Sequence, residues 1–316
     1  MEFSEERVNI EGKVRLGATV TRNGREVSPA IVLIMGTGKL DRDGNGTGSK
    51  MNLYKNMAYM FAEHGYVVVR YDKRGTHGSE GDFNSAGLSD IVDDAVSVVQ
   101  YTKSLPYVDE SRIIVCGHSE GSMIATLLSR KEDVAGLILL GGAGICLREA
   151  LDYQQMLLDK EVSERKGIVG AIMRRTANAE KTAAKTDALF EKCRNSSEDT
   201  IRISGSKVSA KWFREHGSYT GNDFVEMIRS FGKPVLAITG TADLHMDYRR
   251  LDALRDIPSV QCFTPEGVNH ILRKVDDDNR ITGIRKQYAR LASRPMDQDT
   301  AETIFRWLSA VVPAGE

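Results

Sequence analysis

The sequence predicts an α/β fold in which a mostly parallel sheet is wrapped by helices. Apolar runs occur at 31–35, 66–70, 113–116, 137–140, 235–238 and 260–263. Most are hydrophobic throughout, as expected of strands that are covered on both faces. Segments with apolar residues at helical spacing stand between the first four runs. Strands that alternate with helices in this way are typical of a parallel sheet.

The three helical segments are recognised by their apolar faces and their stop signals. In 53–61 the apolar residues share one face, and Gly65 follows as a stop signal. The segment 88–99 repeats the pattern and is predicted to end before Pro106. A third helical face lies at 123–128, directly after the third apolar run.

Two parts of the chain depart from this alternation of strands and helices. Residues 8–20 favour an antiparallel pair of strands leading into the sheet, with a turn at Asn23-Gly24. Between about 145 and 232 we expect no strand, because Lys, Arg, Glu and Ala dominate and the apolar residues have helical spacing. We therefore predict a core in two parts, 1–144 and 233–316, with a helical cap inserted at 145–232. A disordered polar insertion is the alternative.

The composition excludes several classes of protein. Its 43 basic and 44 acidic residues give a net charge of -1, which predicts no general attraction to nucleic acid or anionic membranes. No apolar run approaches the roughly 18 residues of a membrane span. The start, MEFSEERVNI, lacks the features of a signal peptide, and the four cysteines lack metal-binding or disulfide spacing. These features together favour the cytoplasm.

The stretch GTGKLDRDGNGTGSK at 36–50 resembles a phosphate-binding loop only in its glycine content. Neither the Walker spacing nor the dinucleotide-binding spacing fits its glycines. Asp41 and Asp43 would also repel a polyanion. We expect these two carboxylates to fix the turn by bonds to the backbone rather than to contact a substrate.

The motif that indicates a catalytic function is GHSEG at 117–121, which lies between an apolar run and a predicted helix. In this strand-turn-helix context, G-x-S-x-G places a serine on a strained turn at the end of a strand. The flanking glycines avoid clashes there, and Ser119 becomes accessible. The backbone N–H of Glu120 can then stabilise a developing oxyanion, with help from the positive end of the helix.

A serine nucleophile requires a base, and the base requires an orienting acid. Asp243 follows the run 235–238, and His270 follows the run 260–263, so the order is serine, aspartate, histidine. His245 is the rival base, although a near neighbour of Asp243 cannot easily fold back to bridge it and Ser119. The rival acids are Asp247 and Asp252, which fall on the following helical segment and are expected to be solvated.

These motifs, together with DRDGN at 41–45 and YDKRG at 71–75, resemble those of α/β-hydrolase superfamily serine hydrolases. The chain is most similar to bacterial esterases and to dienelactone-hydrolase-like or serine-aminopeptidase-like members with a DRDGN loop. The resemblance implies an α/β-hydrolase fold and a Ser119, His270 and Asp243 triad without a cofactor or metal. It also implies a second oxyanion donor in the loop after the first central strand, with Thr37 N–H favoured and Gly38 next.

Three departures from the family pattern concern the surroundings of the site. Met35 stands where the family has histidine, and DKRGTHGS at 72–79 has one extra residue. Glu120 replaces the common leucine or methionine. Its carboxylate either selects a basic substrate or makes a structural bond into the sheet edge, and we favour the second interpretation.

The expected function is hydrolysis of a carboxylic ester through an acyl-enzyme, with a small-molecule acyl substrate and no nucleic acid or membrane partner. An aminopeptidase would need an acidic pocket for the free amino group. A thioesterase would need a basic patch, which Arg174, Arg175, Lys181 and Lys185 can supply, although we expect these side chains simply to be solvated. A ligand receptor without catalysis is the alternative from a different class. A homodimer is left open as the assembly.

Overall fold

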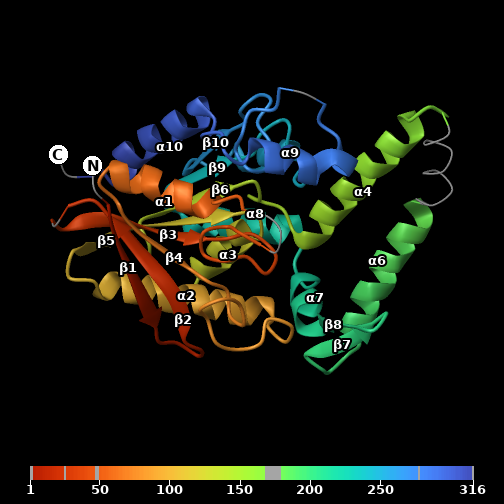
Figure 1. The fold of residues 1–316 in the computed structure, drawn as a ribbon, viewed down its shortest axis with the longest axis horizontal. Coiled ribbons are helices and arrows are strands. Elements are labelled where there is room, and N and C mark those ends of the chain that lie inside the picture. The colour runs from red at the N-terminus through yellow and green to blue at the C-terminus, as the bar shows by residue number, and fades with distance from the viewer. Residues whose placement is uncertain (1–2, 25, 47–49, 168–178, 277, 315–316) are drawn as a thin grey trace.

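An eight-stranded sheet runs through the protein (Figure 1). The computed structural model describes residues 3–24, 26–46, 50–167, 179–276 and 278–314. The strand order is β1-β2-β4-β3-β5-β6-β9-β10, with β1 and β2 antiparallel to their neighbours and the remaining pairs parallel. The strands are β1 Ser4–Ile10, β2 Leu16–Arg22, β3 Ser28–Ile34, β4 Val67–Tyr71, β5 Val108–His118, β6 Gly136–Leu140, β9 Val235–Ile238 and β10 Val260–Phe263. All six predicted core strands and the antiparallel opening pair are confirmed.

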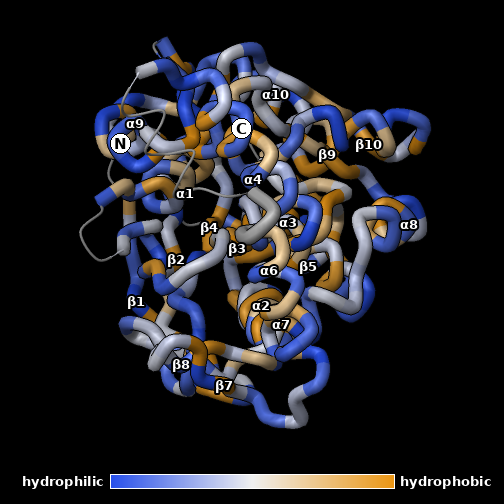
Figure 2. The backbone as a smooth tube through the Cα atoms, turned by 90° about the vertical axis from the view of Figure 1, so that its right-hand side faces the viewer, coloured by the Kyte–Doolittle hydropathy of each residue, from blue (hydrophilic) through white to orange (hydrophobic). Residues whose placement is uncertain are grey.

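Helices cover both faces of the sheet. α1 Leu53–Glu63 and α10 Gln298–Val311 pack on one face, and α2 Leu88–Ser104, α3 Glu120–Leu128 and α8 Gly221–Phe231 pack on the other. The side chains of β3 alternate between the two layers, because Ile31 belongs to the first and Val32 to the second. Figure 2 shows the consequence: the central strands are hydrophobic, whereas the outer strand β1 is largely hydrophilic.

The chain leaves the sheet after β6 and returns to it at β9, which pairs with β6. The intervening elements are α4 Leu147–Glu164, α6 Ala179–Arg194, β7 Thr200–Ile203, β8 Ser206–Ser209, α7 Ala210–His216 and α8. α4 and α6 stand beside each other at the edge of the molecule, with the β7-β8 pair below α6 (Figure 1).

The expectation that this segment contains no strand is wrong. β7 and β8 form an antiparallel pair joined by Ser204 and Gly205, which have φ angles of 48° and 84°. Two consecutive residues with positive φ match the twist of a tight hairpin, and a Ser-Gly pair can adopt this conformation. The strands are only four residues long, so their pattern is weak in the sequence.

The carboxyl ends of β3, β4, β5, β6, β9 and β10 meet at one edge of the sheet, because these strands are mutually parallel. Ligands of open α/β sheets bind at this edge. After β10 the chain continues through η2 Ile281–Gly283 and α9 Ile284–Leu291 to α10. Among the helices of the described ranges, none is long and apolar enough to cross a membrane.

Candidate active site

Ser119 occupies the turn between β5 and α3 in a conformation that few residues adopt, with φ 58° and ψ -124°. A Cβ atom on Gly117 would lie 2.1 Å from the carbonyl oxygen of Gly121. A Cβ atom on Gly121 would lie 2.2 Å from the carbonyl oxygen of Ile34. The motif needs both glycines because the turn presses its backbone against β3 and α3, and this strain is typical of functional turns.

Asp243 and His270 are in direct contact. His270 Nδ1 lies 2.7 Å from Asp243 Oδ2, and the other carboxylate oxygen accepts the N–H groups of His245 at 2.7 Å and Met246 at 3.0 Å. Burial alone would raise the pKa of Asp243, but His270 and these bonds lower it overall. Asp243 is therefore a carboxylate, and it accepts a hydrogen bond from His270 Nδ1–H. This leaves Nε2 as the basic nitrogen of His270.

The rival residues occupy other positions. The ring of His245 lies 4.6 Å from that of His270, centroid to centroid, and contacts Asp243 through its backbone N–H. Burial, with the nearby His270, lowers the pKa of His245 to about 4. Asp252 is exposed and binds Arg255 at 2.8 Å, as expected of a solvated carboxylate. Asp247 differs from the expectation, because its side chain is only 21% exposed, binds Arg249 at 2.8 Å and caps the following turn. The structure thus brings Asp243 to His270 and leaves Asp247 and Asp252 outside this contact.

Ser119 and His270 line one cavity of about 440 Å³ at the carboxyl edge of the sheet. Among the described residues Ser119 Oγ has no hydrogen-bond partner, so its hydroxyl is free to turn toward His270 or a ligand. The cavity walls combine the glycine-rich loop, the start of α4 and α7. Their mainly apolar side chains are Leu40, Met51, Leu53, Leu147, Ala150, Leu151, Trp212, Phe213, Met246, Ile271 and Tyr288.

A buried chain of hydrogen bonds, which the sequence did not reveal, joins the glycine-rich loop to His270. Gly36 N–H donates to the Tyr54 hydroxyl oxygen at 2.8 Å, and that oxygen lies 2.9 Å from His118 Nδ1. His118 Nε2 lies 2.8 Å from the carbonyl oxygen of His270. A carbonyl only accepts, so Nε2 carries the proton and Nδ1 accepts from Tyr54. Burial, with the nearby His270, lowers the pKa of His118 to about 3, which keeps the ring neutral.

This chain bears on the expected oxyanion donors. The Gly36 N–H is already used by Tyr54. Gly36 also lies against the nucleophile, because a Cβ atom on it would be 2.9 Å from Ser119 Cβ. Thr37 follows next and lines the cavity of Ser119, whereas Gly38 lines an adjoining cavity. Glu120 begins α3, where backbone N–H groups lack partners within the helix.

The Glu120 carboxylate is fully engaged by other side chains. It accepts from Lys73 Nζ at 2.7 Å and from Trp212 Nε1 at 2.6 Å, and His216 Nε2 lies 3.1 Å away. Burial would raise its pKa, but Lys73 and His216 lower it overall. These contacts agree with the structural interpretation of Glu120. Its bonds reach α7 as well as the loop after β4.

The two aspartates of the DRDGN loop act locally. Asp41 Oδ1 accepts the N–H groups of Asp43 at 2.9 Å and Asn45 at 2.8 Å, so the expected side-chain bonds that fix the turn are present. Asp43 differs from the expectation, because its carboxylate pairs with Arg70 Nε at 2.8 Å. Neither aspartate lines the cavity of Ser119.

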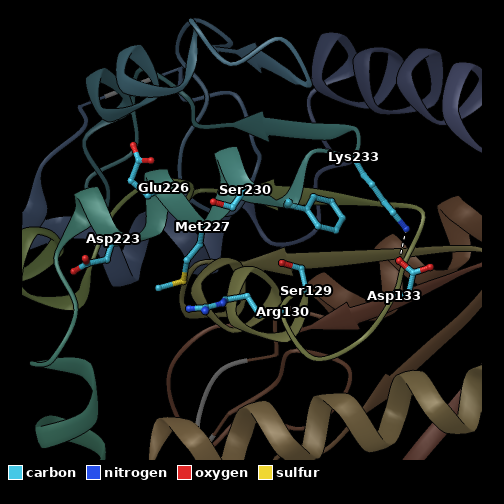
Figure 3. A pocket seen from close by; sticks show the side chains of 9 residues that line it. Ser129, Arg130, Asp133, Asp223, Glu226, Met227, Ser230 and Lys233 are labelled. Carbon is cyan, nitrogen blue, oxygen red and sulfur yellow. Dashed lines mark hydrogen bonds and ion pairs between the residues drawn. The ribbon is translucent and has the colours of Figure 1, made fainter.

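A second cavity of about 270 Å³ adjoins the first. Trp212, Phe213 and Thr37 line both, and Phe83, Ala86, Ile91 and Val208 add further apolar walls to the second. Figure 3 shows a different pocket, of about 530 Å³, between the end of α3 and α8. There Lys233 points to Asp133, and neither Ser119, Asp243 nor His270 lines the walls. We therefore place the candidate site at the first two cavities.

The family of the chain follows from a match over residues 44–264 to the family described as serine aminopeptidase, S33. This range is about two thirds of the chain and includes Ser119 and Asp243. The chain belongs to the S33 serine aminopeptidase family. Esterase EstD of Thermotoga maritima is 28% identical to this family member over 153 residues. That alignment covers 48% of the present chain and 35% of the relative, so it spans about a third of EstD.

Solved structures show that this S33 family member has the predicted α/β-hydrolase fold. It resembles Est1E of Butyrivibrio proteoclasticus with bound ferulic acid, at a TM-score of 0.57 and 19% identity over 91% of this chain and 98% of that one. For the Pyrococcus furiosus esterase Pf2001 the TM-score is 0.58, with 13% identity over 98% and 92%. For the α/β hydrolase GrgF of Penicillium the TM-score is 0.57, with 18% identity over 94% and 99%.

Two further observations concern cofactors and coenzyme binding in this S33 family member. Within the described ranges, no group of three or more His, Cys, Asp or Glu side chains could hold a metal ion. Of the four basic residues that would suit a thioesterase, Arg174 and Arg175 lie outside the described residues. The side chain of Lys181 is likewise not described, and Lys185 is exposed on α6.

Proposed function

We propose that this protein is a serine esterase that hydrolyses carboxylic esters with a small apolar acyl group. The observation that carries the proposal is the 2.7 Å contact between His270 Nδ1 and Asp243 Oδ2, at the cavity that also contains Ser119 on its strained turn. A nucleophile, a base and an acid in this arrangement are what acyl transfer requires. EstD and Pf2001 are both named esterases, which supports the same reaction class.

In the proposed mechanism His270 Nε2 takes the proton of Ser119 as the hydroxyl oxygen attacks the ester carbonyl. The backbone N–H groups of Glu120 and of Thr37, or Gly38 in its place, stabilise the resulting oxyanion, each worth about 3–4 kcal/mol. His270 then protonates the leaving alcohol, and an acyl-enzyme remains on Ser119. Water, deprotonated by His270, attacks this ester and releases the acid. Asp243 stabilises the imidazolium throughout.

The cavity chemistry favours an ester over the amino-terminal residue of a peptide. Recognition of a free ammonium group calls for carboxylates, and none of the described residues that line the cavity of Ser119 is Asp or Glu. Glu120, which lines the adjoining cavity, is already bonded to Lys73, Trp212 and His216. The apolar walls suit an alkyl or aryl acyl group.

We also propose that residues 145–232 act as a cap that supplies part of these walls. Leu147, Leu151 and Gln154 of α4 and Trp212 and Phe213 of α7 line the cavity. α8 differs from the rest of this segment, because Val225 and Ile228 belong to the core under the sheet.

A cytoplasmic location remains a proposal that rests on the composition.

A panel of p-nitrophenyl esters of increasing acyl length, assayed beside aminoacyl p-nitroanilides, tests the proposed function. We expect turnover of short and medium esters at rates well above those of the anilides, and its loss in Ser119→Ala. Faster cleavage of the aminoacyl anilides would instead favour an aminopeptidase. Absence of turnover with every substrate would favour a receptor.

A further inference from the structure

Arg273 is a buried guanidinium group without an acidic partner. Its relative exposure is 2%, and it lies three residues after His270 in the loop that follows β10. Its Nη1 donates to the carbonyl oxygen of Ile271 at 3.0 Å, whereas Nε is buried with no hydrogen-bond partner. Among the ion pairs of the described residues, none includes Arg273. The Nε–H donor of this buried arginine is therefore unused.

The physical cost of this arrangement is large. Burying an ionised group without a counter-charge costs several kcal/mol. Burial lowers the pKa of Arg273 to about 10, and the group remains charged at neutral pH. Buried charges in proteins are normally paired or bound to an ion. The other buried arginine of the described chain, Arg70, obeys this rule through Glu5 and Asp43.

A cavity of about 320 Å³ lies beside Arg273, between α1 and the segment that precedes α10. Its polar lining consists of Arg273, Asn56, Ser293 and Arg294, and its other walls are Met57, Met60, Met296 and Pro295. Figure 1 shows α1 and α10 next to each other at this side of the sheet. Arg294 is exposed and binds Asp276 at 2.7 Å, so Arg273 is the lining arginine that has no carboxylate of its own.

We propose that this cavity binds a small carboxylic acid in its anionic form. The carboxylate accepts hydrogen bonds from Arg273, whose planar guanidinium group matches two carboxylate oxygens. Asn56 and Ser293 can donate to the same group. The apolar body of the acid lies against the methionines, whose flexible side chains adapt to irregular ligands. This combination favours an alkyl carboxylate over inorganic phosphate, which has no apolar part.

The site is distinct from the cavity of Ser119, since the two share none of their described lining residues. The proposal does not depend on the esterase activity, because it concerns binding alone. Hydrogen bonds nevertheless link Arg273 to Asn269, the residue that precedes His270. Asn269 Oδ1 accepts from Arg273 N–H at 3.0 Å, and the backbone N–H of Asn269 donates to the Arg273 carbonyl oxygen at 2.9 Å.

Thermal unfolding and calorimetric titration of the full chain with sodium butanoate test the proposal, with sodium phosphate and sodium chloride at matched ionic strength as comparisons. We expect a saturable shift with butanoate, of about 2 °C at ten times its Kd. Arg273→Met should weaken binding at least about tenfold by removing a charge-assisted bond. Arg280→Met removes an exposed arginine that binds Asp278 outside the cavity and should leave the shift unchanged.

A variant that keeps Arg273 covers the case in which Arg273→Met fails to fold. Met60 is half-buried in the cavity wall, so Met60→Trp should obstruct the cavity and abolish the butanoate shift. Three results would overturn the proposal: no saturable shift with butanoate, a shift that survives both variants, or phosphate binding at least as tight as butanoate. Loss of esterase turnover in Ser119→Ala has no bearing on these results, so the two proposals fail separately.

Discussion

The Tyr54 hydroxyl oxygen lies 2.9 Å from His118 Nδ1 and also accepts the N–H of Gly36 at 2.8 Å. His118 in turn bonds the carbonyl oxygen of His270 at 2.8 Å. The carboxyl end of β5 and the loops after β3 and β10 are thereby tied together in the wall of the cavity. We infer that this relay of hydrogen bonds positions the glycine-rich loop against Ser119 and the proposed base.

Tyr54→Phe tests the relay while preserving the ring. It leaves the Gly36 N–H and His118 Nδ1 unpaired in a buried place, which costs about 1–3 kcal/mol per group. We expect a lower unfolding free energy in urea and a kcat reduced about tenfold, with a smaller effect on KM. Tyr101→Phe removes a half-buried hydroxyl on α2, away from the cavity, and should change neither quantity appreciably. Wild-type kcat in Tyr54→Phe would contradict a positioning role.

The neutral state of His118 predicts acid sensitivity of the fold. Its folded pKa of about 3 lies below the unfolded value of 6.5, so the unfolded chain binds an extra proton between these values. Stability is therefore complete above about pH 6.5 and declines by about 1.4 kcal/mol per pH unit below it. His245, with a pKa of about 4, contributes with the same sign.

Urea unfolding at pH 7, 6 and 5 measures this slope, and His118→Gln should reduce it by about one proton relative to the wild type. Gln is an isostere that does not titrate here, so a reduced slope reports His118 itself even if the absolute stability falls. An unchanged slope would contradict this account, because it would show that His118 binds protons equally in the folded and unfolded states.

His270 and His245 form a matched pair for assigning the base, because both rings line the cavity and lie 4.6 Å apart. His270→Ala removes the ring bonded to Asp243, and we expect kcat to fall at least about 10³-fold. His245→Ala keeps the backbone N–H that binds Asp243 and should lose less than about tenfold. Steady-state kinetics on one ester decides between them, and the reverse order of effects would assign the base to His245.

Trp212 is expected to determine acyl-chain specificity, since it lines both cavities and is held by Glu120 at 2.6 Å. Trp212→Ala should join spaces of about 440 and 270 Å³ and raise the relative kcat/KM for long or bulky acyl esters about tenfold. Trp212→Phe loses the bond to Glu120 but keeps most of the bulk, so it should retain the original preference. A chain-length profile that is identical in Trp212→Ala and the wild type would contradict this role.

The sequence predicted those features that depend on local patterns. The strand at 260–263 has the same bounds in the structure, because turn residues on both sides of a short apolar run fix where the strand begins and ends. Ser119 was found through its flanking glycines, which the turn requires because a Cβ atom at either position would lie only 2.1 or 2.2 Å from a backbone oxygen. The β7-β8 pair was missed because four-residue strands have little periodicity. No helix is predicted after residue 263, although α9 and α10 lie there.

The hydrogen-bond relay and the unpaired Arg273 could not be predicted, because they depend on contacts between distant parts of the chain. Tyr54 and His118 are 64 residues apart, and the tyrosine otherwise looks like one more apolar residue on the buried face of α1. The partners of Glu120 on α7 are more than 90 residues away. Arg273 resembles any charged loop residue until its burial is known. Such long-range contacts depend on how residues 145–232 and the loops pack at the carboxyl edge of the sheet.

Covalent labelling with a fluorophosphonate probe, read by intact-protein and peptide mass spectrometry, tests the central claim most directly. The account predicts one adduct per chain, located on Ser119, and its absence from folded Ser119→Ala. It also predicts much slower labelling of His270→Ala, because the serine then lacks its base. Failure of the folded wild-type protein to react, or an adduct that persists in Ser119→Ala, would contradict the claim that Ser119 is an activated nucleophile.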